Sequence, residues 1–310
     1  MPDLIKNFER FKKTKGDKIM NKEEKKELKA LVRTMYDYQD MRIITKGRIN
    51  ATCGEDVEVN KKFMDEAIIN EKEYSAIEYT LATSIKTEKR LMKEIKKIVH
   101  QEPIWKEFLI NVRGCGELMA AAILSEFDIH IATTRSKMYQ FAGLNPGSVQ
   151  GKEILKITKK TDISKYEVIR EYENQKGDKC AIVLSDEMIR GDKKTKGFLC
   201  PYNSWLRTKL LGVLADTMIR ASGGESGINY AMKFYYPYKA RLEQEENQVM
   251  HLGKMTAWKD VSKGHRDRAA KRYMIKNFLS DLYEHWRAIE GLEVRKSYQE
   301  DYLGHKHNAV

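Results

Sequence analysis

The sequence predicts a mainly α-helical fold, in which a long coiled-coil helix precedes a helical domain with a helix-hairpin-helix and a small antiparallel β insertion. Three observations support this prediction. Apolar residues recur at alternating spacings of four and three over residues 59–101, a Gly-x-Gly turn opens an Ala-rich stretch within residues 109–127, and β-branched residues gather between polar turns at about residues 152–190. The first two patterns indicate helices, and the third indicates short strands.

The composition favours a protein that binds a polyanion. The chain has 310 residues, of which 41% are hydrophobic, enough for about two or three packed units. Its 57 Lys and Arg against 45 Asp and Glu give a net charge of +12, which favours nucleic acid as a partner. The four cysteines show no C-x-x-C spacing, so we expect neither a zinc site nor disulfides. No apolar run approaches the roughly 18 residues of a membrane span, and we expect a cytoplasmic protein without membrane contact.

Residues 1–58 are expected to form a basic helical N-terminal region. Asn21 is a suitable N-cap for a helix from Lys22 to about Ile49, because its side chain can accept hydrogen bonds from the first free amides. The apolar face of this helix comprises Leu28, Leu31, Val32 and Met35. Cys53 and Gly54 then interrupt the periodicity, which indicates a connection to the next helix.

Residues 59–108 carry the coiled-coil pattern. Its a and d positions are Phe63, Ala67, Asn70, Tyr74, Ile77 and Leu81, followed after a shift of four residues by Ile85, Met92, Ile95 and Val99. Two arrangements would cover this stripe: self-association, or antiparallel packing on the helix of residues 22–49 in the same chain. That helix offers few apolar side chains, so we predict a homodimer or higher oligomer. Its contact residues would be Phe63, Asn70, Tyr74, Ile77 and Leu81, with Asn70 fixing the register.

The stretch at residues 109–127, LINVRGCGELMAAAILSEF, predicts the helix-hairpin-helix. Gly114 and Gly116 lack a Cβ atom and can adopt tight or left-handed backbone conformations. The helix that follows begins with unpaired amides and a positive dipole end, which together suit a phosphate oxygen. Arg113, beside the turn, adds a positive charge. The alternative is a plain helix–loop–helix corner in which glycine serves close packing.

The rest of this domain, to about residue 290, is expected to hold further helices around the β insertion. Ser136 could cap a short helix that ends at Gly143. The others are predicted at residues 203–221, 228–246 and 265–289. The last helix should face inward with Ala269, Tyr273, Phe278, Leu282 and Trp286. Residues 291–310 are expected to form a solvated tail.

Five sequence blocks stand in an order that resembles a known family. They are VRGCGELMAAAILSEF (112–127), YQFAGLNP (139–146), KTKG followed by WLRTKLL (194–211), FYYPYKARL (234–242) and GHRDRAAKRYMIKNFL (264–279). Over roughly residues 109–290 this order is similar to the C-terminal transposase domain of the bridge-RNA, DEDD-plus-serine insertion-sequence transposases, the IS one-ten, IS one-sixteen and IS nine-oh-two group. That family also places a long coiled coil before this domain. The resemblance implies DNA binding in transposition or recombination.

The chain also departs from that family at both of its catalytic elements. The family carries four acidic residues on an N-terminal RuvC-like sheet, where they hold a pair of metal ions. Residues 1–108 show only helical pattern, so we expect the RuvC-like half to be missing. The family's serine follows A-G-L-x-P, and Gln150 stands where it is expected, with Ser148 two residues earlier. Ser148 is therefore the candidate nucleophile, with a turn residue as the alternative. Lys152 could clamp a phosphate but not act as the base that a hydroxyl needs.

Basic residues concentrate in two further stretches. In the first, one acidic residue, Asp192, accompanies Arg190, Lys193, Lys194, Lys196, Arg207 and Lys209. In the second, Arg268, Arg272 and Lys276 recur every four residues, which places them on one helical face. A solvated face is the plain interpretation of such a run, and phosphate contact is the functional one. The DNA-contacting residues that we expect are Arg113, Gly114, Gly116, Lys152, Lys193, Lys194, Lys196, Arg207, Lys209, Arg266, Arg268, Lys271, Arg272 and Lys276.

The sequence therefore predicts a DNA-binding protein of transposase descent that serves a mobile element or phage, holds the phosphate backbone and needs no cofactor. Structured RNA is a second candidate partner. One alternative is an active recombinase or nuclease that uses Ser148, or a metal site completed by a partner chain, and only this alternative requires Mg²⁺. The other alternative is an interaction module that binds a host protein through the coiled coil and the hairpin.

Overall fold

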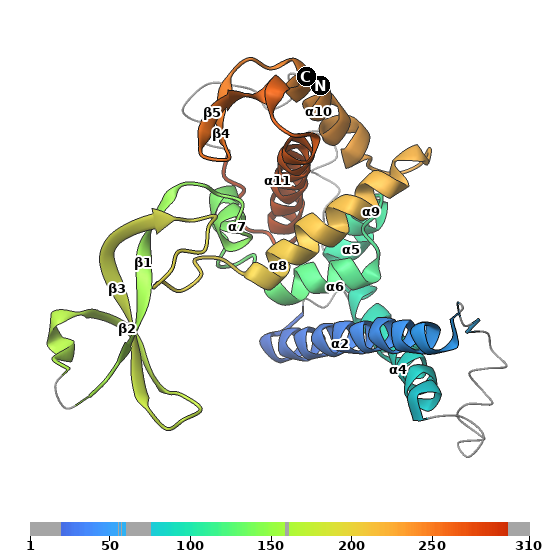
Figure 1. Cartoon of the computed structure of the whole chain (residues 1–310), viewed down its shortest axis with the longest axis horizontal. Coiled ribbons are helices and arrows are strands. Elements are labelled where there is room, and N and C mark those ends of the chain that lie inside the picture. Colours follow the sequence, from blue (N-terminus) through green and yellow to red (C-terminus); the bar gives the residue numbers. More distant parts are fainter. Residues whose placement is uncertain (1–19, 55, 57, 60–75, 159–160, 297–310) are drawn as a thin grey trace. The chain divides into compact units, whose positions relative to one another are not determined.

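The computed structural model describes residues 20–54, 56, 58–59, 76–158 and 161–296. Within these residues the fold is mainly helical, with one three-stranded and one two-stranded antiparallel sheet (Figure 1). The chain divides into two compact units. Of the described residues, the first unit comprises those up to Ile110 together with Cys115–Glu126, and the second comprises Asn111–Gly114 and those from Phe127 onward. No helix in the described ranges is both long and apolar enough to cross a membrane.

The first unit is built on α2 (Lys22–Cys53), whose start is fixed by a capping box. The Asn21 side chain accepts hydrogen bonds from the amides of Glu23 and Glu24, and the Glu24 carboxylate accepts one from the Asn21 amide. These contacts satisfy amides that otherwise lack partners at a helix start. The helix ends at Gly54, whose φ of 76° suits glycine. The predicted cap is confirmed, and α2 extends beyond its predicted end.

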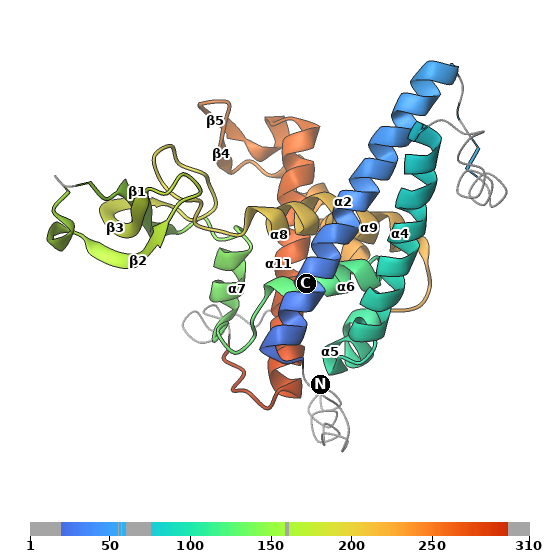
Figure 2. The ribbon, with the colours of Figure 1, turned by 90° about the horizontal axis from the view of Figure 1, so that it is seen from below.

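Two shorter helices, α4 (Ala76–Val99) and α6 (Glu117–Glu126), pack against α2. α4 lies alongside α2 in both views (Figures 1 and 2), and Arg42 Nε of α2 donates to Glu88 Oε1 of α4 at 2.6 Å. The core between the three helices is apolar and includes Leu28, Val32, Leu81, Ile95, Val99, Ala121 and Ile123. The helices of this unit therefore bury one another's apolar faces.

A buried carboxylate ties α6 to α2. The Glu126 side chain is 1% exposed and pairs with Lys29 at 3.0 Å and with Arg33. Burial raises the pKa of Glu126, but the hydrogen bonds from Arg33 and Lys29 outweigh burial, so the pKa lies below its ordinary value. The carboxylate stays charged inside the unit, where its two cationic partners are required to compensate it.

The described part of α4 is covered by its own chain. Leu81 is fully buried inside the first unit, whereas Ile77 is 45% exposed. The arrangement seen is therefore the alternative in which the stripe packs on the earlier helix, because α2 is longer than expected and α6 adds a second packing surface. Phe63, Asn70 and Tyr74 lie outside the described residues. The coiled coil between chains and the oligomer built on it stay predictions.

The predicted hairpin has a short first arm. α5 (Pro103–Glu107) has five residues and is followed by one 3-10 turn (Leu109–Asn111). A tight turn then leads into α6. The arrangement is a short helix–turn–helix corner, and the helix-hairpin-helix motif stays a prediction.

The second unit is built around α11 (Lys263–Ile289), which matches the last predicted helix. The helices beside it are α7 (Arg135–Phe141), α8 (Ser204–Lys209), α9 (Ala215–Arg220) and α10 (Tyr236–Gln244). A π-helical segment (Leu210–Leu214) joins α8 to α9 and contacts α11, as α7, α9 and α10 also do. The buried side chains of this core include Leu206, Leu210, Leu214, Tyr230, Met274, Phe278, Leu282 and Trp286.

The β insertion is a three-stranded antiparallel sheet in the order β1-β3-β2, formed by β1 (Ser148–Lys156), β2 (Glu167–Glu173) and β3 (Lys179–Arg190). This confirms the predicted insertion. A second sheet is a hairpin of β4 (Gln248–His251) and β5 (Lys254–Ala257). The sequence does not predict this hairpin, because strands of four residues are too short to show an alternating pattern.

Candidate nucleic-acid interface

The structure brings the two basic stretches of the second unit together. Arg207 lies on α8, and its guanidinium donates to the backbone carbonyl of Asp192, in the loop that follows β3. Arg207 also interacts electrostatically with Arg272 on α11. We use the name cation cluster for four side chains that converge here: Arg207, Arg268, Arg272 and Lys276. The first comes from one basic stretch of the sequence and the other three from the second.

The period of α11 aligns the three cluster residues of that helix. The spacing of four residues places Arg268, Arg272 and Lys276 along one face, and Ala270 and Met274 are buried on other faces. Ser262 caps the helix start by accepting a hydrogen bond from the His265 amide at 3.3 Å. The periodicity that predicts a charged stripe is therefore confirmed.

Aromatic rings hold two of these cations in place. The Arg207 guanidinium lies 4.8 Å from the Tyr202 ring, and the Lys276 ammonium lies 5.6 Å from the Tyr139 ring. Each contact attracts a cation to the face of the ring and restricts its side chain. Neither tyrosine stands out in the sequence, because no periodicity links it to the cation that it contacts.

Burial opposes the charges at the centre of the cluster. Arg272 and Lys276 are each partly buried, and burial is the largest cause that lowers both of their pKa values. Repulsion adds to this, because Arg207 and Arg268 lower the pKa of Arg272 further, and Arg272 does the same to Lys276. The charge of Asp192 raises both pKa values, but the net direction for each is downward. A bound anion would offset both the burial of these charges and the repulsion between them.

The cluster keeps a positive balance within the unit. Its nearest acidic side chain is Asp192, and Arg190 already donates to both oxygens of that carboxylate at 3.0 Å. Within the described part of the chain, no carboxylate forms an ion pair with Arg272 or Lys276. If Arg190 and Asp192 are taken to cancel, the four charges of the cluster remain available to a polyanion.

Other expected contact residues of the second unit lie on the loop before α8, on β1 and on α8. Lys193, Lys194 and Lys196 are exposed on the loop before α8. Lys152 is exposed on β1, and its carbonyl accepts the Leu199 amide at 2.7 Å, which ties the loop to the strand. One further expected residue, Lys209, lies with its ammonium 5.4 Å from the Trp205 ring.

Two expected contact residues of α11 have internal roles instead. Arg266 is buried, and its guanidinium donates to the carbonyls of Lys259 and Val261, each at 2.7 Å. Lys271 pairs with Asp216 at 2.7 Å and with Asp267 at 3.0 Å. Arg266 is therefore too buried to reach a ligand, and the charge of Lys271 is compensated by two carboxylates. We remove both residues from the expected interface.

The glycine of the turn serves close packing. A Cβ atom on Gly114 would lie 2.5 Å from the backbone nitrogen of Met218, and the Thr217 hydroxyl donates to the Gly114 carbonyl at 2.7 Å. Arg113 is also used internally, because its guanidinium donates to the carbonyl of Ser226 and its amide donates to that of Ile228 at 3.1 Å. At these two positions the plain helix–loop–helix alternative explains the residues.

The helix start after this turn already carries a negative charge. Gly116 is exposed at the start of α6, and next to it the Glu117 carboxylate pairs with Lys96 at 3.1 Å. Burial raises the pKa of Glu117, but the hydrogen bond from its own amide and the Lys96 pair outweigh burial, so the pKa lies below its ordinary value. A carboxylate at a helix N-terminus satisfies the dipole and repels phosphate. The main candidate interface is therefore the cation cluster.

The candidate nucleophile lies in a strand. Ser148 is the first residue of β1 and pairs with Arg190 of β3. No hydrogen bond joins its hydroxyl to a histidine or carboxylate among the described residues. In the same part of the chain, no group of three or more His, Cys, Asp or Glu side chains is placed to hold a metal ion.

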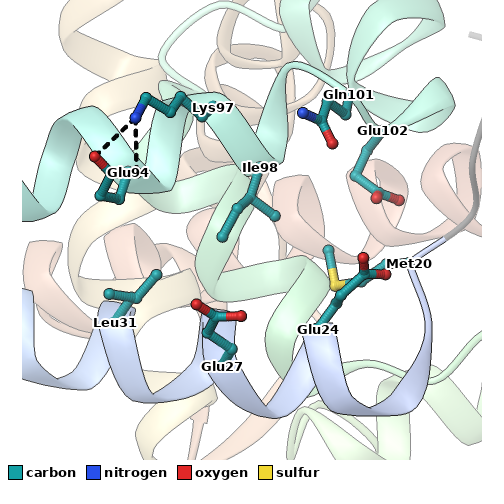
Figure 3. Close-up of a pocket in the computed structure, with 9 residues that line it drawn as sticks. All are labelled: Met20, Glu24, Glu27, Leu31, Glu94, Lys97, Ile98, Gln101 and Glu102. Carbon is teal, nitrogen blue, oxygen red and sulfur yellow. Dashed lines mark hydrogen bonds and ion pairs between the residues drawn. The ribbon is translucent and has the colours of Figure 1, made fainter.

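A cavity of about 300 Å³ lies in the first unit, between the start of α2 and the end of α4 (Figure 3). Its polar lining is mostly acidic, and its residues are Met20, Glu24, Glu27, Leu31, Glu94, Lys97, Ile98, Gln101 and Glu102. The Lys97 ammonium donates to both oxygens of Glu94 at 2.9 Å, so the cavity's one lysine is already neutralised. A lining of this charge repels phosphate, and the cavity is not part of the interface.

No known protein family, curated protein or solved structure matches the chain. The resemblance to transposases therefore stays an expectation that rests on the order of five sequence blocks. The functional argument below rests on the geometry of the cation cluster.

Proposed function

We propose that the second unit binds the phosphate backbone of nucleic acid, with DNA as the first candidate, through the cation cluster and the lysines of the loop before α8. One observation carries this proposal: four cations from separate stretches of the chain converge, and the nearest carboxylate is already paired. Phosphate oxygens would relieve the repulsion among these cations by charge-assisted hydrogen bonds. Arg and Lys contacts to phosphate carry little sequence information, so we infer binding that is largely independent of sequence.

The biological setting is inferred from the order of the sequence blocks. We infer descent from insertion-sequence transposases and a role in transposition or recombination on a mobile element or phage. We assign no strand cleavage to this chain alone, since the Ser148 hydroxyl makes no hydrogen bond to a base among the described residues. A cytoplasmic location fits a nucleic-acid partner. Self-association through residues 59–101 would place two such surfaces on one nucleic acid.

The test is the salt dependence of binding, measured by fluorescence anisotropy with a labelled DNA duplex and, in a second arm, a structured RNA. With about four to eight phosphates neutralised, the log–log slope for the duplex should be about −4 to −7. Arg272→Gln should reduce the magnitude of this slope by about 0.9, the share of one phosphate contact. The matched control is Lys89→Gln, an exposed lysine of α4 in the first unit, which should leave the slope unchanged. No binding of either probe at low salt, or a flat salt response, would refute the proposal.

A further inference from the structure

The β4–β5 hairpin ends in an apolar tip that is open to solvent. Leu252, in its turn, is 90% exposed. Behind it, Met250 and Met255 face each other across the two strands and are 60% and 56% exposed. Single exposed apolar residues are ordinary, but three large ones at the end of one hairpin form a concentrated patch. Such a patch indicates a surface that contacts another molecule.

The backbone of the tip is strained at the most exposed residue. Leu252 has a φ of 50°, and it is the one residue other than glycine with positive φ in the described ranges. This region brings the Cβ atom of an L-residue close to the backbone, so Asn or Gly would be less strained there. Gly253, with a φ of 81°, has no such conflict. A strained leucine that gains nothing from burial points to a use for its side chain outside the fold.

The base of the hairpin is held rigidly on the start of α11. The Trp258 amide donates to the Asn247 carbonyl at 3.1 Å, which closes the open end of the hairpin. The buried guanidinium of Arg266 donates to the carbonyls of Lys259 and Val261, so α11 holds the segment that follows β5. Hydrogen bonds therefore attach the base of the hairpin to the start of α11.

The same helix carries three of the four cations of the cluster, Arg268, Arg272 and Lys276. The His251 ring lies 4.8 Å from the ring of His265, which is on the first turn of α11. Burial lowers the pKa of His265, and the charges of His251, Arg272 and Arg268 lower it further. Exposed Lys254 stands next to the tip. The hairpin with the apolar tip and three cations of the cluster are thus attached to the same helix.

A ligand that fits this arrangement has negative charges on its outside and apolar surfaces within reach of a protruding side chain. Nucleic acid has this chemistry, since phosphates flank a stack of bases and apolar side chains can enter between the bases. An anionic lipid surface also combines charge with apolar material. A flat surface, however, does not reach Arg272 and Lys276, because both are partly buried and the Lys276 ammonium lies over the Tyr139 ring.

We propose that the β4–β5 hairpin is a wedge, in which Leu252, backed by Met250 and Met255, enters a base step of a nucleic acid whose phosphates are held by the cation cluster. This inference rests on the proposed function and adds a second action to it. Binding by cations alone leaves the bases stacked, whereas the wedge separates two neighbouring bases and bends the strand at that step.

The experiment uses the full chain and a set of short DNA duplexes, each with one 2-aminopurine, whose fluorescence rises when the base is unstacked. The wild-type protein should raise the fluorescence at a subset of positions. Leu252→Asn removes the apolar tip, and asparagine tolerates the left-handed backbone of this turn. This variant should bind the duplexes within about threefold of wild type, because phosphate contacts dominate the affinity. Its fluorescence rise should be lost, and its Tm should be equal to or above that of wild type.

The matched control is Ile131→Asn, which removes another large apolar side chain of the second unit, 71% exposed, and should keep the fluorescence rise. Binding by the wild type without any rise in fluorescence overturns the wedge and leaves the proposed function standing. A rise that persists in Leu252→Asn also overturns the wedge. No binding of any duplex overturns the wedge, and the proposed function falls with it only if the structured RNA also fails to bind at low salt. Binding to vesicles of anionic phospholipid that depends on Leu252, without a fluorescence rise on DNA, would assign the tip to a membrane instead.

Discussion

Replacing Lys276 by Met should stabilise the protein and weaken its binding to DNA. Methionine is apolar and flexible, so it can take the place of the lysine stem beside the Tyr139 ring, which lies 5.6 Å from the ammonium. The substitution removes a charge that burial and the neighbouring Arg272 both oppose. Exchanging a poorly compensated, partly buried charge for an apolar group stabilises a protein by about 1 kcal/mol or more. For a unit of this size, that gain corresponds to a rise in Tm of about 2 to 4 °C.

The loss of binding follows from the same side chain. One phosphate contact contributes a salt slope of about 0.9, so at about 0.1 M salt its removal weakens binding by roughly eightfold. Thermal unfolding followed by circular dichroism and anisotropy titration on a DNA duplex measure the two effects. Lys89→Met, on the exposed face of α4, is the control and should change neither quantity beyond experimental error. A destabilised Lys276→Met variant, or one with unchanged affinity, would contradict the account of the cluster.

The stability gain of Lys276→Met should also depend on pH with a defined sign. The pKa of Lys276 is lowered in the folded protein from the ordinary value of 10.5. Between the lowered pKa and 10.5 the unfolded chain binds more protons, so wild-type stability rises with pH in that window. At neutral pH Lys276 is charged in both the folded and the unfolded protein, so the charge destabilises the folded state to its full extent. The advantage of the variant over wild type should therefore be constant near neutral pH and shrink as the pH approaches 10.5.

Two further predictions concern packing and assembly. Gly114→Ala should lower the free energy of unfolding, measured by chemical denaturation, by more than about 2 kcal/mol. The added Cβ atom would clash with the backbone of Met218, and alanine disfavours the positive φ of this position. Gly116→Ala should be nearly neutral, because a Cβ atom there meets no atom within 4 Å. Equal effects of the two substitutions would contradict the packing role of Gly114. If residues 59–101 mediate self-association, light scattering should give a mass above the 36.1 kDa of one chain, and Ile77→Lys, at an exposed position of α4, should restore that mass. A wild-type mass equal to that of one chain would refute the predicted self-association.

Local features of the sequence predict local features of the fold. The cap at Asn21 and the stripe of Arg268, Arg272 and Lys276 depend on residues within one or two helical turns, and both are found in the structure. The three-stranded insertion follows in the same way from β-branched runs between turns. The β4–β5 hairpin escapes prediction because its strands have four residues each.

Features that depend on distant partners are not accessible from the sequence. Arg266 and Lys271 lie in the same basic run as Arg268, and only the fold reveals that the first binds backbone carbonyls and the second binds two aspartates. The role of Gly114 depends on Met218, which is about a hundred positions away. The convergence of Arg207 with Arg272 is of the same kind, since periodicity relates neither residue to the other.

The chain passes from the first unit to the second, back to the first and again to the second, so the two units cannot be separated by one cut in the sequence. A boundary near residue 108, as the sequence suggests, would separate α6 from the first unit, although Glu126 pairs with Lys29 and Arg33 of that unit. A boundary after Glu126 would instead remove Asn111–Gly114 from the second unit, where Val112 forms a bridge with Ile228. No single cut leaves both units intact. Residues 109–290 are therefore not a transferable module, and a protein that acquired them by recombination would have to acquire the preceding helices as well.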